Sequence, residues 1–208
     1  MITRRLNKTQ SSFVLFVPFL ALLVLFTYFY WDNDIPYFQR DPFIKVKEYK
    51  PLINNELAKY NLEKYTPVLL ALMQQESHGN GGDPMQSSES IGLPPNSIKD
   101  PNKSIQIGVN HFRKVLSYGQ EKQVDFATII QSYNMGIGYI SYVSEHGGKH
   151  SEQLAKEFSL LQVQKHPNIY TCKKRLFKSR YPYCYGDYSY SEKVTKNINS
   201  LTNSEINS

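Results

Sequence analysis

The sequence predicts a mainly α-helical domain preceded by one amino-terminal transmembrane helix. A single uncharged run near the amino terminus is long enough to cross a bilayer, and apolar residues beyond it recur at helical spacing. No segment of any length alternates between apolar and polar residues as a strand does. With 208 residues, 40% of them hydrophobic, the chain can form one domain of ordinary size and a short appendage.

The uncharged run extends from Phe13 to Trp31, and its 19 residues match the length of helix that crosses about 30 Å of hydrocarbon. Three basic residues precede it and two acidic residues follow it: Arg4, Arg5 and Lys8, then Asp32 and Asp34. The positive-inside bias therefore predicts a cytoplasmic stub over residues 1–12, a membrane helix over residues 13–31 and an extracytoplasmic remainder. The chain would then be a single-pass protein of the cell membrane, with its domain at the cell surface.

A cleaved signal peptide is the alternative interpretation of this run. Such peptides have shorter apolar regions, roughly 7–15 residues, and end at a site with small residues. Here the run ends in TYFYWDND, which offers no small residue, so a retained anchor is favoured. Both interpretations place the domain outside the cytoplasm, where Cys172 and Cys184 are expected to form a disulfide.

The exported part is interpreted as a linker over residues 32–43, a domain over residues 44–201 and a frayed tail over residues 202–208. Apolar spacing and capping residues predict its helices. They cover residues 51–60, 66–77, 104–118, 139–145, 151–162 and 187–198, and another starts after Asp125. Ser104 and Asp125 are interpreted as amino-terminal caps. Residues 79–95, rich in Gly, Pro, Asp and Ser, are predicted to form a long loop, and such loops are often functional.

The charge of the chain does not require a nucleic-acid partner. The formal net charge is +6, but the part beyond residue 31 carries only +3, which is 21 basic minus 18 acidic residues. A basic segment lies before the last predicted helix: Lys165, Lys173, Lys174, Arg175, Lys178 and Arg180. This segment either contacts anionic lipid head groups and anionic wall polymers or is a solvated surface loop. The histidine and cysteine spacing fits no metal site, and no cofactor motif is found.

One carboxyl group stands out as a candidate acid. Glu76 follows Leu69, Leu72 and Met73 at helical spacing, so it shares a face with apolar side chains. A carboxyl group held against apolar surface loses hydration, which raises its pKa, and a general acid that works near neutral pH needs such a pKa. Spacing alone does not decide, because a glutamate near a helix end is more often simply solvated.

Two further groups of polar residues are candidates for the same site. Asp83 follows in the glycine-rich loop, where it could fold back toward Glu76, although an aspartate before proline is usually a turn former. Gln131, Tyr133 and Asn134 offer a phenol and two amides, which suit sugar hydroxyls and N-acetyl groups. These three residues could equally be an ordinary helix end.

Four ordered blocks carry a family resemblance: LLALMQQESHGNGGDPMQSSES, PPNSIKDPNKSIQIGVNHF, IIQSYNMGIGYI and YGDYSYSEKV. Over residues 44–201 the chain resembles the CwlT-like lysozyme domain of Gram-positive bacteria, within the goose-type lysozyme and soluble lytic transglycosylase superfamily. The resemblance implies a lysozyme-like helical fold with a substrate groove, and peptidoglycan as the partner.

The resemblance also implies roles for individual residues. Glu76 falls on the catalytic acid of the family's Glu-Ser-x-Gly motif, and Asp83 falls on its second acidic position. The positions expected to bind substrate along the groove are Gln86, Ser88, Gln131, Tyr133 and Asn134. The basic insertion between Cys172 and Cys184 departs from the family pattern, and no second peptidase domain follows, as it does in bifunctional members.

Three functions are therefore compatible with the sequence. The first is an N-acetylmuramidase, a glycoside hydrolase that cleaves the β-1,4 bond between N-acetylmuramic acid and N-acetylglucosamine. The second is a lytic transglycosylase, in which the 6-hydroxyl of muramic acid attacks and leaves a 1,6-anhydro end. The third is a non-catalytic wall-binding or scaffold component, against which the intact Glu76 argues.

Overall fold

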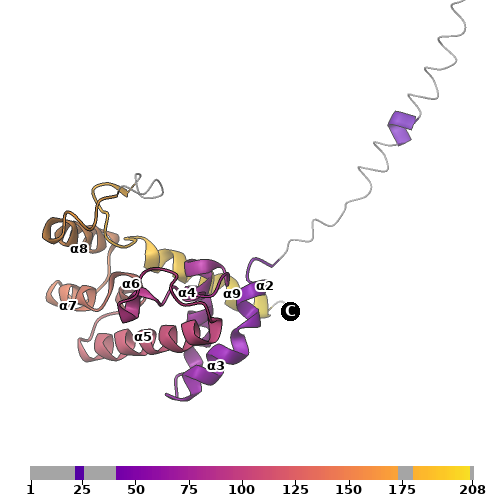
Figure 1. Cartoon of the computed structure of the whole chain (residues 1–208), viewed down its shortest axis with the longest axis horizontal. Coiled ribbons are helices and arrows are strands. Elements are labelled where there is room, and N and C mark those ends of the chain that lie inside the picture. The colour runs from indigo at the N-terminus through magenta and orange to yellow at the C-terminus, as the bar shows by residue number, and fades with distance from the viewer. Residues whose placement is uncertain (1–21, 26–40, 173–179, 207–208) are drawn as a thin grey trace, which may run out of the picture. The chain divides into compact units, whose positions relative to one another are not determined.

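A computed structural model describes residues 22–25, 41–172 and 180–206 of the chain (Figure 1). The chain divides into two units, Met1–Asp41 and Pro42–Ser208. In the first unit, residues 22–25 are helical. The predicted stub over residues 1–12 lies outside the described residues, as do most of the predicted membrane helix over 13–31 and of the linker over 32–43. Within the described residues, no helix combines the length and the apolar character that a bilayer crossing needs.

The second unit is built of α-helices, and no residue described in it belongs to a strand. Its helices are α2 (Ile44–Glu48), α3 (Lys50–Ala58), α4 (Thr66–Ser77), α5 (Pro101–Glu121), α6 (Phe126–Met135), α7 (Gly138–Glu145), α8 (Glu152–Lys165) and α9 (Tyr190–Ile206). Two short 3-10 turns, η1 (Glu63–Tyr65) and η2 (Glu89–Ile91), lie in the connections. The predicted mainly α-helical class is confirmed.

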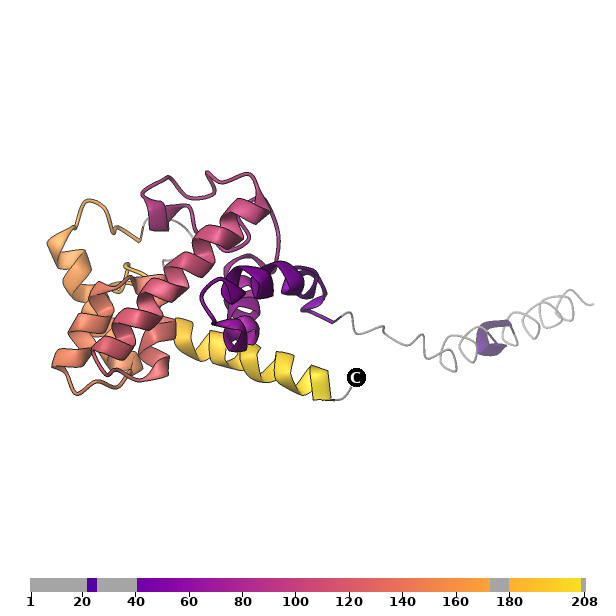
Figure 2. The same cartoon turned by 90° about the horizontal axis from the view of Figure 1, so that it is seen from below.

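Helix α4 occupies the centre of the larger core, and its burial explains why its sequence is apolar on nearly every side. It packs most extensively on α9 and also contacts α2 and α3 (Figures 1 and 2). Pro67 stands in its first turn, and His78 ends it in the left-handed conformation with φ 57°. The predicted bounds, residues 66–77, are confirmed.

A second, smaller core lies at the other end of the domain. It is formed by Met135, Tyr139, Val143, Ala155 and Phe158, from α6, α7 and α8. Helix α6 contributes its earlier residues to the larger core and its last residue to the smaller one. The carboxyl-terminal end of α6 therefore lies where the two cores meet.

Several predicted boundaries are wrong. Helix α5 begins at Pro101, where the Asp100 carboxylate accepts a hydrogen bond from the Asn102 backbone at 2.9 Å, so Ser104 is not the cap. The same helix continues through Gly119 to Glu121, and Gly119 serves close packing rather than a helix end, because a side chain there would collide with Ile129.

The ends of the domain also differ from the prediction. Helix α9 starts at Tyr190 rather than Asp187, and it extends to Ile206 through the residues expected to fray. Phe43, assigned to the linker, is only 6% exposed and belongs to the core, and α2 follows it directly. The caps at Asp125 and Ser151 have the predicted form, since their side chains accept the backbone N–H groups of Thr128 and Leu154.

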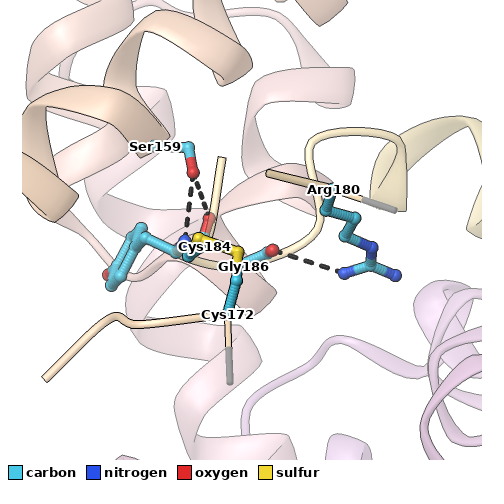
Figure 3. Close-up of a disulfide and its surroundings, with 6 residues drawn as sticks. Ser159, Cys172, Arg180, Cys184 and Gly186 are labelled. Carbon is cyan, nitrogen blue, oxygen red and sulfur yellow. Dashed lines mark hydrogen bonds between the residues drawn. A yellow bond between two sulfur atoms is a disulfide. The ribbon is translucent and has the colours of Figure 1, made fainter. Parts of the chain in front are cut away.

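A disulfide joins Cys172 to Cys184, with the two Cα atoms 5.0 Å apart (Figure 3). Around it, the Ser159 hydroxyl donates to the backbone oxygen of Tyr185 at 2.7 Å and accepts from its backbone nitrogen at 3.1 Å. The predicted basic residues 173–175 and 178 of this segment lie outside the described residues.

Candidate active site

A cavity of about 490 Å³ opens beside the carboxyl-terminal end of α4. Five segments contribute to its wall: the end of α4, the loop that follows it, α5, the end of α6 and the segment before α9. The lining residues are Glu76, Gln86, Ser87, Glu89, Ser90, His111, Tyr133, Asn134, Gly136, Tyr170, Tyr185 and Gly186. A cavity of this size is typical of ligand sites.

Glu76 reaches this cavity from the penultimate residue of α4. Burial raises the pKa of Glu76 to about 7, and the negative charges of Asp83, Glu89 and Asp187 add to the rise. The hydroxyl of Tyr190 donates a hydrogen bond to Oε1 of Glu76 at 2.6 Å, which acts in the opposite direction. The balance leaves a carboxyl group that can still carry a proton at neutral pH.

Two buried phenols surround this carboxyl group. Burial raises the pKa values of Tyr133 and Tyr190 well above the ordinary value, and the charge of Glu76 raises both further. Both phenols therefore remain neutral and act as hydrogen-bond donors: Tyr190 to Glu76, and Tyr133 to the backbone oxygen of Met85 at 3.2 Å. Among the described residues that line the cavity with Glu76, none is a lysine or arginine that would force the carboxyl group to ionise.

Asp83 is placed differently, since it is 2% exposed and does not line the cavity. Its Oδ1 accepts hydrogen bonds from the backbone nitrogen of Ser87 at 2.9 Å, from the Ser87 hydroxyl at 3.2 Å and from the Ser104 hydroxyl at 2.6 Å. Its Oδ2 accepts from the backbone nitrogen of Ser88 at 3.0 Å and from the Ser88 hydroxyl at 2.5 Å. Burial raises the pKa of Asp83, but these donors outweigh it and the pKa is lowered.

Asp83 therefore stays ionised and fixes the loop after α4 onto α5. The loop places Gln86 and Ser87 in the cavity wall, so Asp83 holds two lining residues in position without lining the cavity itself. The structure does not bring its carboxylate into the cavity beside Glu76.

The five residues predicted to bind substrate separate into two groups. Gln86, Tyr133 and Asn134 line the cavity, whereas Ser88 and Gln131 are fully buried and do not. The Gln131 side chain donates to the backbone oxygen of Asp187 at 2.6 Å and accepts from the backbone nitrogen of Ser191 at 2.9 Å. These two bonds hold the backbone on both sides of Tyr190, and thereby its hydroxyl against Glu76.

Several residues of the site were not among the predicted ones. Tyr190 and Tyr185 lie in the block YGDYSYSEKV, and His111 in the block ending VNHF, so the resemblance could have drawn attention to them. Glu89 is the second carboxyl group of the cavity wall among the described residues. Tyr170 had no signal in the sequence, because only the folded chain brings it to the cavity. The described part of the chain contains no cluster of three His, Cys, Asp or Glu residues that could hold a metal ion.

The domain is helical, and a half-buried glutamate at the end of a core helix lies beside a polar cavity. Comparison with known proteins identifies a family with this architecture. The pattern of the lysozyme-like family matches residues 44–198, and the chain belongs to this family. Its domain is related to the muramidase domain of CwlT, so the resemblance found in the sequence is confirmed.

Individual proteins of known sequence are similar to this chain. The chain is 51% identical over 160 residues to YocA of Bacillus subtilis, named an uncharacterized membrane protein, with 77% of this chain and 71% of YocA covered. It is 50% identical over 98 residues to the bifunctional muramidase/DL-endopeptidase CwlT of Bacillus subtilis, with 47% of this chain but only 29% of CwlT covered. It is 36% identical over 155 residues to a pneumococcal vaccine antigen A homolog of Streptococcus pyogenes, with 74% and 71% covered.

A solved structure shows the same fold. It is the crystal structure of a protein described as similar to a lipoprotein of the NLP/P60 family, from Staphylococcus aureus. The TM-score is 0.63 at 35% sequence identity, over 74% of this chain and 52% of that one. The likeness supports the helical lysozyme-like architecture described above.

Proposed function

We propose that the chain is an N-acetylmuramidase, which hydrolyses the β-1,4 bond between N-acetylmuramic acid and N-acetylglucosamine in peptidoglycan. The observation that carries the proposal is the carboxyl group of Glu76, whose pKa is about 7 and which lines a cavity of about 490 Å³. A glycosidase needs such a group to deliver a proton to the leaving oxygen. The relation to the CwlT muramidase domain supports the same chemistry.

In the proposed reaction, Glu76 protonates the glycosidic oxygen while the bond from that oxygen to the anomeric carbon breaks. The bonding electrons leave with the oxygen, and an oxocarbenium-like centre develops on the muramic acid ring. Glu76 is then a carboxylate, and the hydrogen bond from Tyr190 stabilises that charge. Water adds to the anomeric carbon and gives its proton to Glu76, which restores the starting state.

Support for the developing cation is assigned to the N-acetyl group of the substrate. The Asp83 carboxylate is the other group that could stabilise the cation. Both of its oxygens, however, accept hydrogen bonds from serines, and it does not line the cavity. Asp83 is accordingly proposed as a positioning residue for the loop that carries Gln86 and Ser87. Gln86, Tyr133 and Asn134 are proposed to bind sugar hydroxyl and N-acetyl groups.

Lytic transglycosylation is the second candidate, and one observation favours it. With Asp83 engaged, Glu76 and Glu89 are the carboxyl groups that the described residues place in the cavity wall. If Glu76 acts first as acid and then as base, without help from Asp83, it serves attack by the 6-hydroxyl of muramic acid as well as attack by water. Mass spectrometry of digested peptidoglycan separates the two, because the anhydro product is lighter by one water.

The proposed setting is the outer face of the cell membrane. Residues 13–31 would form a retained single-pass anchor with the amino terminus in the cytoplasm. The disulfide between Cys172 and Cys184 supports an extracytoplasmic domain, since disulfides persist in oxidising compartments. The described helices themselves contain no span of this kind.

The experiment that tests the function is a zymogram on peptidoglycan with the wild-type chain and with Glu76→Gln. The wild type is expected to clear the gel, and Glu76→Gln is expected to lose at least about a thousandfold in rate with an unchanged helical circular-dichroism spectrum. Gln keeps the size and hydrogen-bonding oxygen of the side chain but has no proton to give. Equal clearing by the two proteins would show that another group is the acid.

A further inference from the structure

The segment between α8 and α9 contributes two tyrosine rings to the cavity wall, and the proposed chemistry does not use them. Tyr170 and Tyr185 both line the cavity that holds Glu76. Their ring centroids are 4.7 Å apart with an interplanar angle of 73°, an edge-to-face arrangement. Apolar ring surface therefore borders the space in which a glycan strand would bind.

Tyr185 is the fixed member of the pair. Its hydroxyl donates to the backbone oxygen of Met135 at 2.7 Å, and its backbone nitrogen and oxygen both bond to the hydroxyl of Ser159 (Figure 3). Its ring also packs edge-on against Phe158 at 5.9 Å. Three separate contacts thus tie Tyr185 to α6 and α8.

Tyr170 is held from a different direction. Its backbone nitrogen donates to the oxygen of His166 at 3.1 Å, just past the end of α8. Two residues later, Cys172 is bonded to Cys184, which immediately precedes Tyr185 in the chain. The disulfide, drawn in Figure 3, therefore joins the chain two residues after Tyr170 to the residue before Tyr185.

The charge of the cavity indicates which ligand these rings suit. The described lining residues include two glutamates and His111 but no lysine or arginine. Burial lowers the pKa of His111, so the lining residues that the structure describes offer no strong cation for an anionic polymer. An uncharged N-acetylated sugar fits better, because its ring offers an apolar C–H face that can pack on a tyrosine ring and polar groups at its edge that can bond to the polar lining.

We infer that Tyr170 is a stacking residue for an uncharged sugar ring of the glycan strand, and that the Cys172–Cys184 disulfide keeps it in the cavity wall. The inference rests on the proposed function and deepens it by adding a subsite formed by the segment that closes the disulfide. Tyr185 positions Tyr170 by the edge-to-face contact. Stacking accounts for part of substrate binding and leaves proton transfer by Glu76 unchanged.

The test measures binding of an oligosaccharide of N-acetylglucosamine by calorimetry, with the full chain in detergent and Glu76→Gln present to prevent turnover. Tyr170→Ala is expected to weaken binding about tenfold, whereas Tyr170→Phe keeps it within about threefold. Tyr181→Ala is the matched control, because Tyr181 is 77% exposed, lies in the same segment and does not line the cavity. Equal affinities of Tyr170→Ala and Tyr181→Ala, or no binding by any variant, would overturn the inference.

The role of the disulfide is tested by a cycle of variants. Replacing both cysteines by serine is expected to weaken binding about as much as Tyr170→Ala, and combining the changes should add little further loss. Fully additive losses would mean that the disulfide acts elsewhere. If the serine variant loses its helical circular-dichroism spectrum, the disulfide of the folded wild-type chain is reduced at low temperature instead. The reduced chain is expected to bind the oligosaccharide as weakly as Tyr170→Ala does.

The two proposals fail separately. In the catalytically intact background, Tyr170→Ala should raise KM on peptidoglycan and leave kcat within about threefold. A wild type that binds the oligosaccharide through Tyr170 but never clears peptidoglycan would contradict the proposed function alone. A wild type that clears peptidoglycan with a KM indifferent to Tyr170→Ala would contradict the stacking subsite alone.

Discussion

Glu76 and Asp83 are two carboxyl groups seven positions apart in the chain, both removed from bulk water, and the fold drives their pKa values in opposite directions. Among the described residues, Tyr190 is the one whose side chain donates a hydrogen bond to Glu76, and the pKa of Glu76 is raised to about 7. Asp83 receives five hydrogen bonds from three serines, and its pKa is lowered. Burial raises the pKa of both groups, and only at Asp83 do the donors outweigh that effect.

The difference also separates two tasks that the sequence alone could not separate. A group that must give up a proton benefits from few donors, because each donor stabilises the ionised form. A group that must hold a loop benefits from many donors, because each one ties a further segment to it. Glu76 fits the first description and Asp83 the second.

The largest effect is expected when the donors around Asp83 lose their acceptor. Asp83→Asn removes the charge and places an amide N–H₂ group among backbone and hydroxyl donors, so we expect a loss of about 3 kcal/mol in the free energy of unfolding. Ser104→Ala, which deletes one of the five bonds, should cost about 1 kcal/mol. Urea unfolding measures both. An Asp83→Asn variant as stable as the wild type would remove the loop-holding role.

At Glu76, replacing the carboxyl group by an amide is expected to raise the free energy of unfolding, not to lower it. Below pH 4.5 both the folded and the unfolded chain are protonated at this position, and as pH rises to about 7 only the unfolded chain releases the proton. Stability is therefore lost across that window, and Glu76→Gln, which does not titrate, should be more stable than the wild type by about 2 kcal/mol at pH 8.

The matching control is the same pair of proteins at pH 4, where the difference in the free energy of unfolding should shrink to a few tenths of a kcal/mol. Urea unfolding at the two pH values gives the comparison. A gain in stability of equal size at both pH values would show that Glu76 is not held protonated by the fold.

A smaller effect is expected from the single donor of Glu76. Tyr190→Phe removes the hydrogen bond that lowers the pKa of Glu76, so the alkaline limb of the kcat/KM profile should move to higher pH. The maximal rate should fall by less than about tenfold, because the acid itself remains. An alkaline limb that moves to lower pH would contradict the assignment of that limb to Glu76.

The smallest effect is expected from a neighbouring charge. Glu89 lines the cavity, and its negative charge contributes to the raised pKa of Glu76. Glu89→Gln should therefore move the alkaline limb to lower pH, by less than the shift in Tyr190→Phe and more at low salt than at high salt. A rate loss as severe as that of Glu76→Gln would instead make Glu89 a participant in the chemistry.

The sequence predicted those features that depend on short stretches of chain. Helix α4 was bounded correctly because Pro67 and the turn at His78 and Gly79 mark its ends locally, and its apolar spacing placed Glu76 beside the core. Four ordered blocks were enough for the family resemblance, and hence for Glu76 as the candidate acid.

Features that depend on contacts between distant residues were missed. Ser104 reads locally as a helix cap, yet its hydroxyl binds Asp83 from a position 21 residues away. Gln131 reads as a sugar ligand, yet it bonds to the backbone on both sides of Tyr190, 56 to 60 residues away. Tyr170 lines the cavity from the segment that ends at the disulfide, and no local sequence pattern predicts that position.

The protonation state of Glu76 can be measured directly by carbon-13 NMR of the glutamate carboxyl groups, with Glu76→Gln used to assign the resonance. If the fold holds Glu76 protonated, one glutamate resonance should titrate near pH 7 and should be missing from the Glu76→Gln spectrum. A Glu76 resonance that titrates near the ordinary value of 4.5 would contradict it, since the carboxyl group would then have no proton to donate at neutral pH.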